Sequence, residues 1–269
     1  MSDSSQLLEQ LLAEIGAGPK YRHVSADLVR RIGQRELAAR RSFNEAVHAT
    51  RNKLHQIAGA YLGGRMRYTK WLDLLAAAAP NGDPALRDAC AQIMAYHAST
   101  RERLSILAEF YRTTLAQIAP ICSVLDVACG LNPLALPWMG LDRDVAYYAC
   151  DIYADMMDFL NGFFAIAGVP GCAEVCDVVG GPPAHSVDLA LALKTLPPLE
   201  QVEKAAGLNL LKALRARHIL VSFPTHSLGG RDKQMRINYE QRFREMVRAE
   251  RWTLQRFEFA TELCFLLST

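Results

Sequence analysis

Hydrophobic residues in the first 120 positions of the chain recur at the spacing of an amphipathic helix. Clusters of glycine and proline interrupt this pattern, and each interruption predicts the end of one helix. The helices expected from the pattern cover residues 7–15, 25–37, 44–61, 71–79 and 84–118. The first part of the chain is therefore predicted to be helical throughout.

Short apolar runs replace this pattern after residue 120 and alternate with two helix-like segments, 153–167 and 200–214. Strands that alternate with helices are typical of parallel βαβ units in a doubly wound sheet. The strands expected from the runs cover residues 121–127, 145–150, 173–176, 187–193 and 218–223. Two further runs, 252–259 and 262–267, are closely joined and predict an antiparallel hairpin at the sheet edge. The pattern thus predicts an α/β fold, with a domain boundary between residues 80 and 120.

Hydropathy and the first residues of the chain argue against a membrane protein. No apolar run reaches the roughly 18 residues that a membrane-spanning helix needs. The opening sequence, MSDSSQLLEQ, lacks the basic and apolar regions of a secretory signal. We expect a cytoplasmic protein that makes no membrane contact.

Cysteine usage fits the same compartment. The chain has 7 cysteines, an odd number, and no two of them form a Cys-x-x-Cys pair. Cys172 and Cys176 stand four residues apart without a histidine nearby, which makes a zinc site a poor interpretation. We expect free thiols and no metal site.

The net charge of +2 conceals an uneven distribution. Residues 1–70 contain 12 Lys and Arg against 6 Asp and Glu, whereas residues 71–269 contain 18 against 22. A basic segment beside a mildly acidic remainder is typical of an appendage that binds a polyanion. A solvated helical surface would give the same distribution, so charge alone leaves both interpretations open.

Acidic residues follow the predicted strands at the points where a ligand crevice is expected. The first strand of the predicted sheet ends at Asp126 and leads into a turn of small residues that contains Gly130. The second strand ends at Asp151, and a third acid, Asp177, follows the next short strand. Because the carboxyl ends of parallel strands open a crevice, Asp151 is placed to accept hydrogen bonds from ribose hydroxyls. Asp177 is placed to read an adenine amino group.

Three interpretations of these acids compete. Dinucleotide dehydrogenases use Gly-x-Gly-x-x-Gly to approach a pyrophosphate, and this loop has only Gly130 followed by Leu131-Asn132-Pro133. A nucleoside without phosphate, such as S-adenosylmethionine, needs fewer glycines. In the third interpretation Asp126 and Asp151 only cap helices. The missing glycines favour the nucleoside.

The residues of this loop, DVACGLNP at 126–133, resemble the glycine loop of the aminoglycoside-resistance 16S rRNA (guanine(1405)-N(7))-methyltransferase family. Further motifs of that family appear in the same order along the chain. They are similar to residues 97–104, 193–197, 221–225, 227–231, 235–239 and 261–263, and upstream to residues 20–21, 29–31, 54–55 and 59–61. The resemblance covers nearly the whole chain.

The resemblance implies a Rossmann-like class I S-adenosylmethionine methyltransferase with a mainly parallel seven-stranded sheet. An all-helical N-terminal domain at residues 1–105 would dock on ribosomal RNA, and residues 106–269 would form the catalytic domain. Members of the family methylate guanine N7 in the decoding-site helix of 16S rRNA within the assembled 30S subunit. They thereby confer resistance to 4,6-disubstituted deoxystreptamine aminoglycosides. A monomer is expected.

The resemblance also implies roles for individual residues. Arg103 would hold the methionine carboxylate, Asp151 the ribose and Asp177 the adenine. The full set that would contact S-adenosylmethionine is His97, Ser99, Arg103, Asp126, Ala128, Gly130, Asp151, Ile152, Asp177, Val178 and Lys194. The residues that would surround the target base are Lys194, Ser222, Arg231 and Glu262. The residues that would contact RNA follow instead from the need for phosphate contacts, and the basic candidates are Arg30, Arg31, Arg51, Lys53, Arg65 and Arg67. Met235 is a further expected RNA contact.

The chemistry of guanine N7 agrees with these residues. N7 carries a lone pair and no proton, so attack on the methyl group needs no general base, and the sequence offers no obvious one. A carboxylate such as Glu262 could stabilise the ring as it becomes cationic, and Lys194 could bind guanine O6 or a flanking phosphate. The base must be flipped out of its helix, and Phe223 or Tyr239 could stack on it.

Other functions stay open at this point. The chain could methylate another rRNA nucleotide or a small molecule, or it could be a non-catalytic RNA-binding factor with the same fold. The set of Arg103, Asp126, Gly130 and Asp151 argues against the non-catalytic factor. A nicotinamide dehydrogenase agrees least with the glycine-poor loop.

Overall fold

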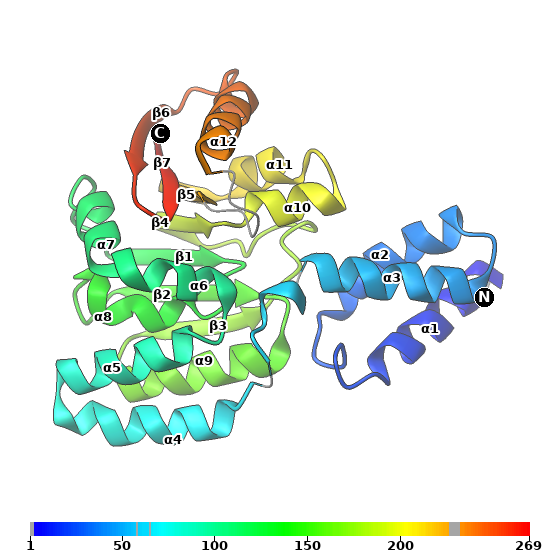
Figure 1. The fold of residues 1–269 in the computed structure, drawn as a ribbon, viewed down its shortest axis with the longest axis horizontal. Helices are drawn as coiled ribbons and strands as arrows, with labels where there is room; N and C mark the ends of the chain where they lie inside the picture. The colour runs from blue at the N-terminus through cyan, green and yellow to red at the C-terminus, as the bar shows by residue number, and fades with distance from the viewer. Residues whose placement is uncertain (1–2, 58, 65, 226–231) are drawn as a thin grey trace.

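A seven-stranded sheet forms the centre of the computed structural model, which describes residues 3–57, 59–64, 66–225 and 232–269 (Figure 1). The strands are β1 (Ser123–Val127), β2 (Ala146–Asp151), β3 (Gly171–Val175), β4 (Ser186–Leu193), β5 (Arg215–Pro224), β6 (Thr253–Glu258) and β7 (Glu262–Ser268). Each lies within a few residues of an apolar run in the sequence. The predicted number of strands is confirmed.

The strand order is β3-β2-β1-β4-β5-β7-β6. Strands β1 to β5 are parallel, whereas β7 runs antiparallel to both β5 and β6, so the sheet is mixed. The expected antiparallel hairpin is therefore present, with β6 at the edge. The order reverses between β1 and β4, and such a reversal places a ligand crevice at the carboxyl ends of these strands.

Both faces of the sheet are covered by helices, which is why its central strands are apolar throughout rather than alternating. On β1, Val124 packs into the apolar core on one face, and Leu125 and Val127 pack into the core on the other. The first core is closed by α4 (Tyr68–Ala78), α5 (Asp83–Met94), α7 (Leu107–Leu115), α8 (Leu136–Met139) and α9 (Ala154–Ala167). The second is closed by α10 (Leu196–Val202), α11 (Ala206–Ala213) and α12 (Asp232–Val247).

Three helices at the start of the chain project from the side of the sheet as a separate lobe (Figure 1). They are α1 (Asp3–Gly16), α2 (Ala26–Ala39) and α3 (Phe43–Ile57), called the α1–α3 lobe below. Two backbone hydrogen bonds join the lobe to the segment after β2: Ser25 N donates to Ile152 O at 2.7 Å, and Ala154 N donates to His23 O at 2.8 Å. Val24 and Tyr153 thereby form an antiparallel bridge. All described elements before β1 are helical. The division into domains at residue 105 stays a prediction.

Two predicted helices are wrong in their continuity. The segment 84–118 is not one helix, because the chain turns at Tyr96 and His97 before α6 (Ala98–Arg103). Tertiary hydrogen bonds hold that turn: Gly63 N donates to Tyr96 O at 2.8 Å, and Leu62 forms a bridge with His97. Likewise 200–214 contains two helices, α10 and α11. Short 3-10 turns are η1 (Gly59–Tyr61), η2 (Ala79–Asn81), η3 (Leu104–Ile106) and η4 (Asn132–Ala135).

No helix in the described ranges is both long enough and apolar enough to cross a bilayer.

Candidate functional site

The carboxylate of Asp151 lies at the end of β2 and is fixed by the backbone around it. Gly130 N donates to its Oδ2 at 2.9 Å and Ile152 N donates to its Oδ1 at 2.6 Å. Burial raises the pKa of Asp151, although these two N–H groups act in the opposite direction by favouring the charged form. Each carboxylate oxygen keeps a further acceptor position, as a bound diol would require.

Gly130 is required by both backbone conformation and space. Its φ is +52°, a region that disfavours side chains, and a Cβ added there would lie 2.7 Å from His97 Cε1. The ring of His97 therefore packs directly on the loop that follows β1. Burial, together with the nearby cations Arg103, Lys194 and Arg101, lowers the pKa of His97 to about 4, so the imidazole is neutral at pH 7.

We predict that Gly130→Ala weakens binding of S-adenosylhomocysteine by about tenfold or more, because the loop and the His97 ring must move apart. Calorimetric titration of the purified variant measures this affinity. Gly140→Ala is the matched control, since Gly140 has a φ of +64° and a Cβ there would meet nothing within 4 Å. Equal affinities for the two variants would contradict the prediction.

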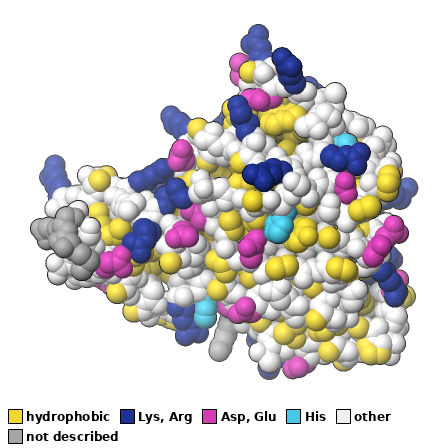
Figure 2. All heavy atoms as spheres, turned by 180° about the vertical axis from the view of Figure 1, so that it is seen from behind, with side chains coloured by type: hydrophobic (Ala, Val, Ile, Leu, Met, Phe, Trp, Pro, Cys, Tyr) yellow, Lys and Arg dark blue, Asp and Glu magenta, His cyan; other side chains and the backbone are white. Residues whose placement is uncertain are grey.

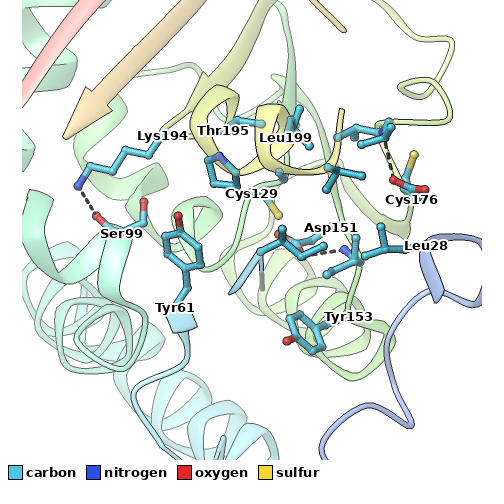
Figure 3. A pocket seen from close by; sticks show the side chains of 18 of the residues that line it. Leu28, Tyr61, Ser99, Cys129, Asp151, Tyr153, Cys176, Lys194, Thr195 and Leu199 are labelled. Atoms are coloured by element: carbon cyan, nitrogen blue, oxygen red, sulfur yellow. Dashed lines mark hydrogen bonds between the residues drawn. The ribbon is translucent and has the colours of Figure 1, made fainter. Parts of the chain in front are cut away.

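A cleft opens beside this loop and runs between the ends of β1, β2 and β4 (Figure 3). It encloses about 780 Å³ of empty space including its open mouth. Lys194 and Ser99 lie at one end, Leu28 and Cys176 lie at the other, and Asp151 lies between them. Eight of the residues expected to contact the cofactor line this cleft: His97, Ser99, Ala128, Asp151, Ile152, Asp177, Val178 and Lys194.

Three of the residues that line the cleft come from the N-terminal segment and were not expected there from the sequence. Leu28 on α2, Ile57 on α3 and Tyr61 just beyond α3 all face the cleft. Tyr61 stacks against His97 with ring centroids 6.0 Å apart. Residues 59–61 form one of the motifs shared with the resembled family, and this was a signal that Tyr61 has a role. Nothing local in the sequence indicates that α2 and α3 reach the sheet.

Asp177 forms an ion pair with Arg31. The distance from Arg31 Nε to Asp177 Oδ2 is 2.8 Å, and the Asp177 side chain is only 4% exposed. Arg31 was expected to contact RNA, whereas in the structure its guanidinium pairs with Asp177 beside the cleft.

Arg103, Asp126 and Gly130, the other three residues expected to contact the cofactor, are buried and do not line the cleft. Arg103 Nε lies 2.8 Å from Glu262 Oε1, and Arg103 Nη1 donates to Asn132 Oδ1 at 2.7 Å. The Asn132 amide in turn donates to Asp126 Oδ2 at 2.8 Å. Burial raises the pKa of Asp126 to about 7. The Arg103 guanidinium is thus already paired, and its contact with a methionine carboxylate stays a prediction.

Lys194 is held between two carboxylates. Its Nζ lies 2.6 Å from Glu102 Oε2 and 3.3 Å from Glu262 Oε1, and it donates to Ser99 O at 3.3 Å. The backbone of Lys194 has a φ of +58°, and its N–H donates to Ser222 Oγ at 3.1 Å. Ser222 and Glu262 are both 0% exposed. They contact Lys194, but they do not line the cleft themselves.

The remaining expected base contacts fall elsewhere. Arg231 lies outside the described residues. Phe223 is buried among Phe243, Phe265 and Tyr239, and its ring centroid lies 5.0 Å from that of Tyr239. Phe223 therefore belongs to the apolar core, and its stacking on a base stays a prediction. Tyr239 is half-buried.

The residues expected to contact RNA are mostly engaged within the protein. Arg30 pairs with Glu9 at 2.7 Å and Arg51 with Glu14 at 3.4 Å. Lys53 donates to the Gln201 carbonyl at 3.4 Å. Arg67 is exposed and Met235 is half-buried on α12, whereas Arg65 lies outside the described residues.

A basic groove nevertheless lies between the end of α2 and α3. It is lined by Arg40, Arg41, His48 and Lys53 together with two acids, Glu36 and Glu45. On the face seen in Figure 2, Lys and Arg side chains lie on the α1–α3 lobe and are interspersed with acidic ones. In the part of the chain that the structure describes, no group of three or more His, Cys, Asp or Glu could hold a metal ion.

Comparisons with known proteins agree with this arrangement. The chain is 39% identical to a 16S rRNA (guanine(1405)-N(7))-methyltransferase of Frankia casuarinae, over 99% of this chain and 95% of the relative. It is 37% identical to the enzyme of the same description from Micromonospora echinospora, over 97% of this chain and 96% of the relative. The structure superposes with a TM-score of 0.82 on the 16S rRNA methyltransferase RmtF in complex with S-adenosyl-L-homocysteine, at 32% identity over 100% and 99% of the two chains. Residues 17–266 match the family described as Ribosomal RNA methyltransferase (FmrO), and the chain belongs to that family.

Proposed function

We propose that this protein transfers a methyl group from S-adenosylmethionine to N7 of one guanine in 16S rRNA, at the position that its relatives' names give as 1405. The observation that carries the proposal is the cleft that brings Asp151, Asp177 and Lys194 together at the point where the strand order reverses. The modification would give resistance to 4,6-disubstituted deoxystreptamine aminoglycosides.

The residues of the cleft fit the nucleoside part of this cofactor. Asp151 keeps acceptor positions for two ribose hydroxyls, and the absence of a side chain at Gly130 lets the His97 ring pack on the loop beside it. Apolar side chains from Leu28, Val178 and Leu199 provide walls for a flat base. When bound, the cofactor supplies a methyl group that is activated by a sulfonium charge.

Guanine N7 accepts that methyl group without losing a proton, so the protein only has to position the base. Catalysis then comes from an in-line approach of about 3 Å between the reacting atoms. Burial and nearby cations lower the pKa of His97 to about 4, so its imidazole is a weak base, which agrees with a reaction that uses no general base.

Lys194 is the predicted base contact that reaches the cleft. Its ammonium group can donate to guanine O6, a common contact to this base, by exchanging its hydrogen bond to Ser99 O for one to the base, while Glu102 and Glu262 hold it in place. Ser222 and Glu262 act through Lys194 as positioning residues. Tyr61 lies at the same end of the cleft (Figure 3), and we assign to it the stacking role for which Phe223 and Tyr239 were the candidates expected from the sequence.

The α1–α3 lobe would dock the enzyme on the 30S subunit, with the protein acting as a monomer in the cytoplasm where ribosomes are found. Phosphate contacts would offset the few kcal/mol that flipping the base costs. The best candidates are the groove residues Arg41 and Lys53, together with exposed Arg67.

We predict that Arg41→Ala combined with Lys53→Ala weakens binding to 30S subunits and reduces the salt dependence of that binding. Each lost phosphate contact lowers the slope of log K against log salt by roughly 0.7–0.9. Filter binding across a salt series measures the slope. Arg217→Ala is the control, since Arg217 lies near the start of β5, at the end of the strand away from the cleft, and its side chain is 69% exposed. An unchanged slope in the double variant would remove the groove from the docking surface.

The proposed function is tested by mass mapping of 16S rRNA from a strain that expresses the protein. A single methyl group on the guanine at 1405, with resistance to gentamicin-type but not apramycin-type drugs, is the expected result. A methyl group on a different nucleotide would overturn the assignment of the target. Unmodified RNA together with methylation of a small molecule would overturn the substrate class.

A further inference from the structure

Residues 23–25, which connect α1 to α2, contact the loop that follows Asp151, and α2 itself contacts the loop that contains Asp177. His23 O accepts a hydrogen bond from Ala154 N at 2.8 Å, and Ser25 N donates to Ile152 O at 2.7 Å. These contacts fix the backbone that immediately follows Asp151. The same segment continues into α2, which brings Arg31 to the loop that contains Asp177.

Arg31 on α2 makes that second contact. Its Nε donates to Asp177 Oδ2 at 2.8 Å, while Val179 N donates to Asp177 Oδ1 at 3.1 Å. Both oxygens of the buried carboxylate are therefore oriented, and each keeps one acceptor position. A Cβ at Gly180 would lie 2.5 Å from Arg31 Nη2, so the absence of a side chain there makes room for the guanidinium.

The opposite ends of α2 serve different sites. Leu28, one turn before Arg31, lines the cofactor cleft. Arg40 and Arg41, just past the end of the helix, line the basic groove of the lobe. A rigid helix that contacts both sites can transmit a displacement from one to the other.

We propose that Arg31 is a positioning residue that orients Asp177 for the cofactor and makes cofactor binding and 30S docking cooperative. The identity of the two ligands rests on the proposed function. Cofactor in the cleft stabilises the arrangement of Asp177, Arg31 and α2 in which the basic groove is presented to RNA. By thermodynamic linkage, docking on the 30S subunit tightens cofactor binding by the same factor.

The first test measures S-adenosylhomocysteine affinity by calorimetry in the absence of RNA. Arg31→Ala leaves a buried carboxylate unpaired, and we expect about tenfold weaker binding. Arg30→Ala is the matched control on the same helix, since Arg30 pairs with Glu9 on the surface, and its affinity should match the wild type. If Arg31 served only as a phosphate contact, Arg31→Ala would bind S-adenosylhomocysteine normally, and the proposal would be overturned.

The second test measures 30S affinity with and without saturating S-adenosylhomocysteine. The wild type should bind at least about fivefold more tightly with the nucleoside present, and this gain should disappear in Arg31→Ala. A wild type that binds S-adenosylhomocysteine but shows no gain overturns the cooperativity. A wild type that binds no S-adenosylhomocysteine at all would instead count against the proposed function.

A conservative variant covers the case in which Arg31→Ala fails to fold, as judged by its thermal transition. Arg31→Lys keeps the charge but cannot direct two nitrogens at Asp177 and Gly180, so intermediate affinity and intermediate cooperativity are expected. Wild-type values in Arg31→Lys together with an unfolded Arg31→Ala would overturn the positioning role, because the charge alone would then suffice.

Discussion

Replacing Glu262 with alanine is expected to lower the free energy of unfolding by about 3–5 kcal/mol, because the change leaves the buried guanidinium of Arg103 without its carboxylate and removes one of the two carboxylates that hold Lys194. Glu262 is 0% exposed and contacts Arg103 at 2.8 Å and Lys194 at 3.3 Å. Arg103 is itself 0% exposed and has no route to solvent. The thermal midpoint should fall by roughly 6–20 °C, given about 2–4 °C per kcal/mol for a chain of this size.

Glu258→Ala provides the comparison for this experiment. Glu258 lies at the end of β6 and pairs with Arg236 and Arg256, but its side chain is 39% exposed. Ion pairs in contact with water contribute about 0–1 kcal/mol, so the thermal midpoint should change little. Similar thermal midpoints for Glu262→Ala and Glu258→Ala would show that the contacts of Glu262 with Arg103 and Lys194 do not contribute the expected stability.

Lys194→Ala is expected to reduce the rate of methylation of 30S subunits by about 100-fold or more, the usual cost of removing an electrostatic contact to a reacting group. Affinity for S-adenosylhomocysteine should stay within about threefold of the wild type. The reason is geometric, since the Lys194 ammonium points toward Ser99 and Glu102 and away from Asp151 (Figure 3). Lysine already occupies the left-handed conformation at this position, so alanine adds no backbone strain.

Single-turnover methylation and calorimetry separate the two effects of this change. Lys204→Ala is a suitable control, because Lys204 is exposed just beyond α10. A large loss of nucleoside affinity in Lys194→Ala would move Lys194 from the target base to the cofactor. A methylation rate equal to that of the wild type would remove it from both.

The strands could be predicted from the sequence because this sheet is covered on both faces. Leu125, Val127 and their neighbours are buried whichever way they point, so β1 appears as an uninterrupted apolar run. The turn at His97 could not be predicted, since its hydrogen bonds come from residues 62–63 rather than from the helix pattern. Helix α12 was also missed, because much of its surface is polar and few of its residues reach the core.

The candidate site could be predicted where its residues follow a strand. Asp151, Asp177 and Lys194 each stand at or just beyond the end of a strand, and the structure brings them to one cleft. Contacts between distant segments could not be predicted. Arg31 pairs with a residue 146 positions away and Arg103 with one 159 positions away, so neither pairing leaves a local signal. Charge alone therefore suggested an RNA contact for Arg31.

The position of α2 against the cleft has a consequence for inhibitor design. A compound that competes with the cofactor and extends past Asp151 would meet Leu28 and Ile57, which belong to the α1–α3 lobe and not to the sheet. Methyltransferases that consist of the sheet and its covering helices alone have no equivalent wall. Selective blockade of this enzyme, and with it restored sensitivity to aminoglycosides, would start from those two side chains.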